Sequence, residues 1–278
     1  MSLIIVYDRP GCGPVCVENT VSQLQRVSDD RSQCVKLFSE CSDPFNPREV
    51  SLFTIPGGNA VDMQKDRLFA DTAEKIRRLV QIDGVSYLGI CAGAIEATRD
   101  YSMSHFNTYN RNKLELEPLR YKPSINLYNG SSVLVPNFSN DLGLCTSQDI
   151  LIKKSDEKPY HSKIIELKGC YFPSPTQTED TSVILEYMQD CERSYASQYT
   201  LKTSACAIKH KSQNGTIVLS GAHPELDGPA ISEISKRIAR SQRETEAFSS
   251  AASEIVPYDR DRDEIMKLFL DELSIPTK

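Results

Sequence analysis

The sequence lacks both a long hydrophobic run and an excess of positive charge. No apolar stretch reaches the roughly 18 residues that a membrane-spanning helix needs, so we expect no transmembrane segment. The 32 Lys and Arg residues are outnumbered by 38 Asp and Glu residues, and the formal net charge is -6. Because phosphate binding requires a basic face, this balance argues against nucleic acid. We expect neither nucleic acid nor a membrane among the partners of this chain.

The start of the chain also lacks the features of a secretory leader. Residues 1–8 read MSLIIVYD, a short apolar run with no basic residue ahead of it. We therefore expect a cytoplasmic protein in which this run forms a first, buried strand. The 278 residues, 39% apolar and 25% charged, are sufficient for one large globular domain or two small ones.

Histidine is scarce, with four residues, whereas cysteine is abundant, with nine. An odd number of cysteines at irregular spacing, without a leader, favours free thiols over a disulfide framework. Cys12 and Cys16 form a single C-x-x-x-C pair, with no second pair and no histidine near them in the sequence. Zinc needs about four ligands, so we expect a free or locally paired thiol there and no metal site. No other pattern indicates a metal or a cofactor.

Hydrophobic patterning divides the chain into an α/β part, a β-rich part and a helical end. In residues 1–100, strand-like apolar runs alternate with helical segments, which predicts a doubly wound, mostly parallel sheet with helices on both faces. Residues 101–215 contain short strand-like runs between polar loops and predict an antiparallel β extension. From about residue 229 the pattern is helical, with one apolar stripe interrupted at Pro257 and an amphipathic helix over 261–273.

These patterns predict two regions, an α/β domain over residues 1–228 and a helical extension over residues 229–278 that packs on it. The amphipathic helix at the end of the chain has two interpretations. Its apolar face packs on the domain itself, or it docks a partner protein.

The strongest chemical motif lies in residues 87–94, YLGICAGA, between a predicted strand and a predicted helix. It has the form G-x-C-x-G, a nucleophile elbow with cysteine in place of serine. The sharp turn requires small flanking residues, which Gly89 and Gly93 provide. Cys91 then starts a helix, whose dipole favours the thiolate. The alternative is a buried structural cysteine in a glycine-rich turn.

A thiol nucleophile needs a base, and the base needs an orienting carboxylate. Residues 220–225, SGAHPE, follow an apolar strand and supply both groups, in His223 and Glu225. The proline between them stiffens the segment, so Glu225 can hold one imidazole nitrogen while the other faces the thiol. The alternative for His223 is a satisfied histidine of the core or surface. His210, in the sequence KHK, is expected in an exposed basic turn.

Acyl chemistry also needs two N–H donors for the developing oxyanion. The backbone N–H of Ala92, directly after the nucleophile, is one candidate. Gly57 and Gly58, in the strand-end sequence IPGGN, are candidates for the second, because absent side chains allow a close approach. Asn59 beside them is a candidate substrate contact, although this segment alone is more simply a turn. The three motifs follow predicted strands and converge on one sheet edge, where such folds bind ligands.

Together these motifs resemble the class I glutamine amidotransferase superfamily, and more closely the glutamine amidotransferase-like domain at the N-terminus of biotin–protein ligases. The matching stretches lie within residues 1–228 and are VY with its Gly/Pro turn, IPGG, LGICAG, YNG and LSGAHPE. The resemblance implies a flavodoxin-like core and a triad of Cys91, His223 and Glu225. We expect a stand-alone, glutaminase-like amidase that acts on a small-molecule carboxamide or a related C–N acyl group, a substrate class that the resemblance by itself does not settle.

Departures from the family pattern keep other interpretations open. Position 95 is Ile, where glutaminases of this kind carry Gln, and no ligase or synthetase motif is present. A second interpretation is that the chain is a binding or regulatory module that keeps the fold but has little turnover. A thiol-based sensor that uses Cys91 without Glu225 is a third interpretation.

Overall fold

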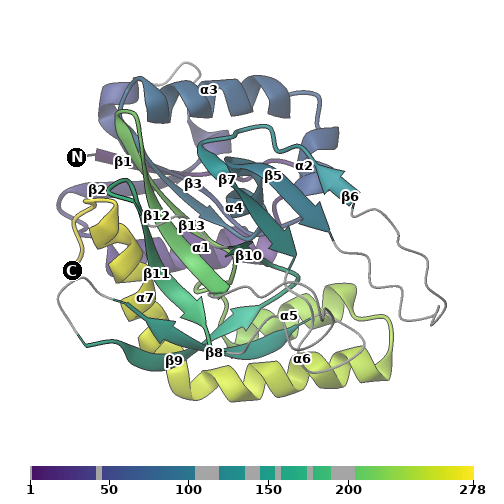
Figure 1. Ribbon diagram of the computed structural model, residues 1–278. Coiled ribbons are helices and arrows are strands. Elements are labelled where there is room, and N and C mark those ends of the chain that lie inside the picture. Colours follow the sequence, from purple (N-terminus) through teal and green to yellow (C-terminus); the bar gives the residue numbers. More distant parts are fainter. Residues whose placement is uncertain are drawn as a thin grey trace.

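The computed structural model describes residues 2–41, 46–103, 119–134, 145–153, 158–173, 178–188 and 204–278. Within these ranges the chain forms one large β-sheet with helices packed against it (Figure 1). No helix of the described ranges is long and apolar enough to cross a bilayer.

The elements alternate between strand and helix at the start of the chain and end in three helices. The strands are β1 (Ser2–Val6), β2 (Gln33–Leu37), β3 (Val50–Ile55), β4 (Ser86–Ile90), β5 (Thr98–Met103), β6 (Leu119–Tyr121), β7 (Tyr128–Leu134), β8 (Thr146–Ile152), β9 (Tyr160–Glu166), β10 (Cys170–Pro173), β11 (Thr181–Tyr187), β12 (Ser204–Ser212) and β13 (Gly215–Ser220). The α-helices are α1 (Pro14–Val27), α2 (Ala60–Lys65), α3 (Phe69–Gln81), α4 (Ala92–Ala97), α5 (Gly228–Ile238), α6 (Gln242–Ile255) and α7 (Asp259–Glu272). Short 3-10 helices are η1 (Phe38–Glu40), η2 (Pro47–Glu49) and η3 (Val256–Tyr258).

Five parallel strands form the centre of the sheet, in the order β2-β1-β3-β4-β13. This is the strand order of flavodoxin-like doubly wound folds, which confirms the expected fold class. β4 and β13 are neighbours, and Ile90 lies opposite Ser220 in their register. Because parallel strands end at the same edge of a sheet, the residues that follow β4 and β13 meet there.

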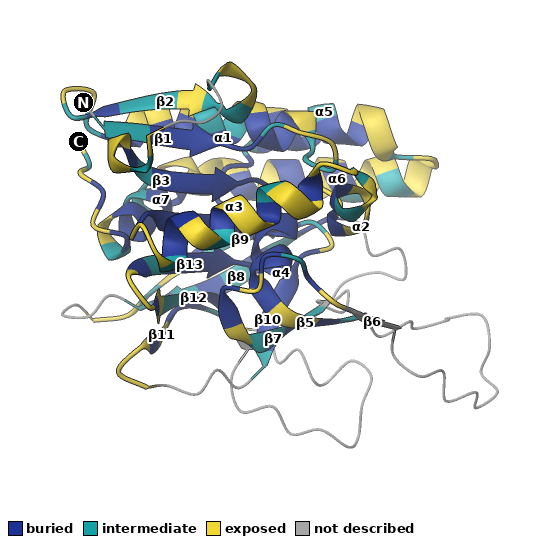
Figure 2. Ribbon diagram, turned by 90° about the horizontal axis from the view of Figure 1, so that it is seen from above, coloured by how far each residue is buried: buried dark blue, intermediate teal, exposed yellow. Residues whose placement is uncertain are grey.

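The central strands are buried on both faces, and successive side chains enter two different cores. Ile4 and Val6 of β1 pack with residues of α1 and α7, whereas Ile5 packs with residues of α3. Side chains of a strand point alternately to its two faces, so a strand covered on both faces is a continuous apolar run in the sequence. Figure 2 shows the buried strands and the exposed outer surface of α3.

Beyond β13 the sheet continues mainly with antiparallel strands, as expected for the middle of the chain. β12 pairs with β13, the sheet then runs through β10, β7, β5 and β6, and β11, β8 and β9 branch from β12. His210 lies in β12 and not in an exposed turn, so that expectation was wrong. Its ring is half-buried, and its Nδ1 is hydrogen-bonded to Thr181 Oγ1 at 2.8 Å. On a strand the lysines on either side of His210 share the opposite face, so the KHK sequence does not require a turn.

The C-terminal region contains two helices before Pro257, where the apolar stripe predicted one. α5 ends at Ile238, and Ser241 caps the start of α6 by accepting a hydrogen bond from Glu244 N–H. Serine favours helix starts because its hydroxyl accepts a hydrogen bond from a free N–H of the first turn. Because Ser241 was not used as a helix start, the apolar stripe predicted one helix.

All three C-terminal helices pack on the rest of the chain. α5 and α7 contact α1, and α6 covers β8 and β9 (Figure 1). The apolar face expected for the last helix is buried in the protein itself, and its residues are Ile265, Leu268, Phe269 and Leu273. The division of the chain at residues 228 and 229 stays a prediction.

Candidate active site

Cys91 lies at the sharp turn between β4 and α4. Its backbone has φ +49° and ψ -104°, a conformation that residues other than glycine rarely adopt, and its N–H donates to Ser220 O at 2.7 Å. The flanking glycines are sterically required. A Cβ on Gly89 would lie 2.7 Å from the carbonyl carbon of Gly93, and a Cβ on Gly93 would lie 2.2 Å from Ile55 O. The expected elbow geometry is therefore present.

His223 and Glu225 lie just beyond the end of β13, whose last residue, Ser220, accepts a hydrogen bond from the backbone N–H of Cys91. His223 Nδ1 is 2.8 Å from Glu225 Oε1, and the two residues are only 1% and 2% exposed. The backbone N–H of His223 donates to Ile165 O at 2.8 Å, which holds this segment against β9. The hydrogen bond to the carboxylate fixes the orientation of the imidazole ring.

The charges around His223 favour the imidazolium form. Burial by itself lowers the pKa of this histidine, but the Glu225 carboxylate and the Cys91 side chain outweigh it and raise the pKa well above 6.5. A protonated imidazole beside a thiol is the arrangement that stabilises a thiolate nucleophile.

A second thiol, that of Cys16, also lies beside His223. Cys16 is in the first turn of α1 and is buried, and its Sγ lies within 4.8 Å of both His223 and Glu225. Burial raises the pKa of the Cys16 thiol, and His223 opposes that rise. The sequence did not indicate this residue, because only tertiary packing brings α1 to the end of β13. The eight cysteines of the described ranges are free, as expected, and Cys191 lies outside those ranges.

The two glycines of the IPGGN segment permit two close contacts. A Cβ on Gly57 would lie 2.3 Å from Cε1 of His223, so only glycine lets the imidazole ring pack on this backbone. A Cβ on Gly58 would lie 2.0 Å from Gly11 O, in the loop that precedes α1. The two groups that come close to this turn are therefore the His223 ring and the loop before α1.

The remaining expected site residues have defined places near the elbow. The IPGGN turn pairs with the loop before α1 through two hydrogen bonds. Gly13 N–H donates to Gly57 O, and Asn59 N–H donates to Gly11 O. This pairing does not use the N–H of Gly58. Ala92 is the first residue of α4, where N–H groups have no partner within the helix. The side chain of Asn59 has a structural role, since it caps α2. Contact of these residues with an oxyanion or a substrate stays a prediction.

The turn between β9 and β10 covers the thiol of Cys91. Leu167 O accepts the hydrogen bond of Cys91 Sγ at 3.9 Å, and Cys91 is only 3% exposed. Glu166 holds the turn, because its buried carboxylate accepts a hydrogen bond from Gly169 N–H at 2.7 Å. Burial raises the pKa of Glu166 to about 7. No local sequence signal pointed to this turn, whose position depends on long-range strand pairing.

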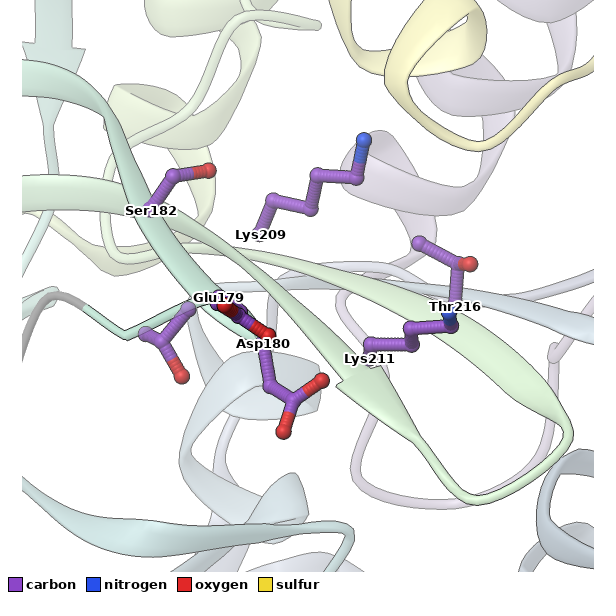
Figure 3. A pocket seen from close by; sticks show the side chains of 7 residues that line it. Glu179, Asp180, Ser182, Lys209, Lys211 and Thr216 are labelled. Carbon is purple, nitrogen blue, oxygen red and sulfur yellow. The ribbon is translucent and has the colours of Figure 1, made fainter.

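A separate hollow of about 280 Å³ lies at the opposite edge of the sheet (Figure 3). It is lined by Glu179, Asp180, Thr181, Ser182, Lys209, Lys211 and Thr216. Thr216 stands near the start of β13, whereas Ser220 at its end contacts Cys91. The hollow therefore does not belong to the Cys91 site.

The sequence of the chain matches the family described as "Biotin-protein ligase, N terminal" over residues 2–278. The chain is also 25% identical over 255 residues to a biotin–protein ligase of Schizosaccharomyces pombe (strain 972 / ATCC 24843). That match covers 87% of this chain and 36% of the ligase, so the chain spans about a third of the length of the curated relative.

Solved glutamine amidotransferases have a similar fold. One from Thermotoga maritima has a TM-score of 0.58 at 8% identity and covers 98% of this chain and 97% of its own. Another, from Methylobacillus flagellatus, has a TM-score of 0.51 at 11% identity and covers 98% and 94%. These likenesses establish a glutamine amidotransferase-like fold of the flavodoxin type. Because the family match extends over nearly the whole sequence, the chain belongs to the family of biotin–protein ligase N-terminal domains.

Proposed function

We propose that the chain is a cysteine-dependent amidohydrolase in which Cys91, His223 and Glu225 act as a triad. The observation that supports this most strongly is the geometry at one sheet edge. A thiol on an elbow lies beside an imidazole, and a carboxylate lies 2.8 Å from the Nδ1 of that ring. This is the nucleophile, base and orienting group of covalent acyl transfer.

The proposed substrate is a small-molecule carboxamide or a related C–N acyl compound. The Cys91 thiolate attacks the carbonyl carbon, the C–N bond breaks, and His223 donates its proton to the leaving amine. The acyl group stays on Cys91 as a thioester, which a water molecule deprotonated by His223 then hydrolyses. The backbone N–H groups of Ala92 and Gly58 are the proposed donors to the oxyanion. This chemistry needs no cofactor.

Substitution of the nucleophile tests the proposal. We expect Cys91→Ala to reduce hydrolysis of a panel of amides, glutamine first, by about a thousandfold or more, because loss of a triad nucleophile removes the covalent route. Cys34→Ala is the matched control, since it removes a half-buried thiol of β2, and it should hydrolyse at the wild-type rate. Turnover that Cys91→Ala leaves unchanged would contradict the triad.

The acyl donor can be sought with the same nucleophile. An amide that the site accepts should slow the labelling of Cys91 by an electrophilic probe, because the two compete for the same thiol. Amides that protect Cys91 from the probe, and leave the labelling of Cys34 unchanged, identify the substrate class.

A second candidate function is a binding or regulatory module with little turnover. The closed site favours it, because Leu167 O lies over the thiol and both Cys91 and His223 are buried. Ile95, one turn after the nucleophile, also differs from the glutamine-contacting residue of the amidase pattern. Fast, selective alkylation of Cys91 near neutral pH, relative to the other cysteines, would count against this function. A slow reaction would support it.

For partners, we propose a small amide and neither nucleic acid nor a membrane, in line with the net charge of -6. The apolar face of α7 packs within the protein, so a protein partner at the C-terminal helices would bind their outer, polar surfaces. A cytoplasmic location is likewise a proposal.

A further inference from the structure

Three donor atoms of different chemistry converge beside the Cys91 thiol. They are Sγ of Cys16, in the first turn of α1, and a ring nitrogen of His223 and a carboxylate oxygen of Glu225, both after β13. The three atoms lie within 4.8 Å of one another, and all three residues are buried. The sequence predicted no metal site at Cys16, because no histidine lies near it along the chain. In the folded protein, His223 lies beside it.

Two polar atoms of this cluster have no hydrogen-bond partner among the described residues. They are Nε2 of His223 and Oε2 of Glu225. Both side chains are almost fully buried, and a buried polar atom without a partner is costly and uncommon. A cation coordinated in the cluster would satisfy such atoms.

The donor set suits zinc and not the hard cations. Ca²⁺ and Mg²⁺ take oxygen ligands. Zn²⁺ takes thiolate, imidazole and carboxylate ligands together, in tetrahedral sites with bonds of about 2.0–2.3 Å. Bonds of that length place the ligand atoms roughly 3.3–3.8 Å apart. The donors lie within 4.8 Å of one another, so Zn²⁺ would have to draw them together, and it would replace the 2.8 Å hydrogen bond between His223 Nδ1 and Glu225 Oε1.

We propose that Zn²⁺ binds to Cys16, His223 and Glu225. On binding, the Cys16 thiol and the His223 imidazolium each release one proton, so two protons are exchanged for one Zn²⁺. The bound ion, one thiolate, one carboxylate and one neutral imidazole have zero net charge together, which suits a buried position. With three protein ligands, a water molecule is the candidate fourth ligand.

Zinc binding would compete with catalysis at this site. A His223 that coordinates the metal cannot exchange a proton with Cys91 or with a leaving amine, so zinc inhibits amide turnover. This consequence rests on the proposed function, whereas the zinc site itself does not.

Zinc affinity of the reduced, metal-free chain tests the site. A chromophoric zinc chelator of known affinity, used as a competitor in the presence of a reductant, reports stoichiometry and affinity. We expect one Zn²⁺ per chain. We also expect binding to weaken by about tenfold or more in Cys16→Ala, because even outer-shell partners of a metal contribute about 10- to 100-fold to its affinity. Cys34→Ala is the matched control and should bind zinc as the wild type does.

Equal zinc affinity in the wild type and Cys16→Ala, or an equal loss in Cys34→Ala, would overturn the proposal. Circular dichroism checks that each variant is folded. Cys16→Ser keeps the size of the side chain and removes the soft ligand, so it should show the same weakening. Co²⁺ in place of Zn²⁺ should give a thiolate-to-metal absorption band that Cys16→Ser loses.

The zinc site and the amidase can fail separately. Zinc binding that depends on Cys16, in a chain without amide turnover, supports the site and counts against the amidase. Amide turnover that depends on Cys91, in a chain that does not bind zinc, supports the amidase and overturns the site.

Discussion

At Gly57 the ring of His223 occupies the place that a side chain would take. A Cβ there would lie 2.3 Å from Cε1 and 3.0 Å from Nδ1 of the ring, well inside van der Waals contact. Nδ1 is also the atom that bonds Glu225, so a displaced ring would lose its alignment with the carboxylate. The position of the imidazole ring therefore requires glycine at this place.

We expect Gly57→Ala to displace the imidazole and to lower amide turnover by about a hundredfold, since a misplacement of about 1 Å typically has that effect. Gly84→Ala is the control, because its positive φ of 77° strains an alanine but its nearest neighbour is Asn214, which lies outside the site. The rate of Cys91 alkylation is a second readout that does not depend on the choice of substrate. Wild-type values for both in Gly57→Ala would show that the site does not need His223 in its observed place.

Among the elements, the turn between β9 and β10 connects the antiparallel extension to the candidate triad. Leu167 O accepts a hydrogen bond from the Cys91 thiol, and Ile165 O accepts one from the backbone N–H of His223. Gly169 packs on the segment that follows β13, where an added Cβ would lie 1.9 Å from Gly221 O. The extension thus closes one side of the site, and we expect a bound substrate to displace this turn.

Glu166 makes the stability of this turn depend on pH. Burial raises its pKa from 4.5 to about 7, so the native state binds this proton more tightly than the unfolded state does. The free energy of unfolding therefore declines as the pH rises from about 4.5 to about 7. Glu166→Gln keeps an acceptor for Gly169 N–H and cannot ionise. We expect it to remove this decline, which amounts to about 3 kcal/mol at most.

Urea unfolding of Glu166→Gln and the wild type at about pH 5 and about pH 8 measures the effect. The two proteins should differ little at the lower pH, and the variant should be more stable at the higher pH. Glu254→Gln, on the exposed surface of α6, controls for the loss of one carboxylate. A difference that does not change with pH would show that Glu166 does not hold its proton in the native state.

In the whole molecule, each C-terminal helix packs in a hydrophobic cluster with earlier parts of the chain: α7 with α1 and the central strands, and α5 and α6 with the start of α1 and Ile165 of β9. Phe269 of α7 is fully buried in the cluster that contains Leu24 of α1 and Leu88 of β4. The chain end also returns to α1, where Lys278 N–H donates to Val27 O at 2.9 Å. Because these clusters join residues before and after residue 228, we expect both regions to unfold together.

We expect Phe269→Ala to lower the free energy of unfolding by about 3–5 kcal/mol, because it empties a large buried volume. Far-UV circular dichroism and the accessibility of the Cys91 thiol should report the same single transition in urea. Ile238→Ala, at an exposed position at the end of α5, is the control and should change stability by less than about 0.5 kcal/mol. Two separate transitions would instead indicate an independent helical extension beyond residue 228.

Local patterns in the sequence determined the parallel core and the candidate triad. The apolar runs of β1, β3 and β4 were readable because strands covered on both faces have no polar side. The G-x-C-x-G motif required a sharp turn at Cys91 whatever surrounds it. His223 and Glu225 were recognisable as a pair because they are two residues apart and bond each other directly.

Tertiary structure alone decided the surroundings of that triad. The middle of the chain was predicted only as an antiparallel extension, without the bounds of β9 to β12, because its strands pair with partners far away in the sequence. The positions of Glu166 and Leu167 therefore could not be predicted. Cys16 reaches His223 only because α1 packs beside the end of β13. Such contacts join residues far apart in the sequence. They depend on how whole elements pack, and no short stretch of sequence contains that information.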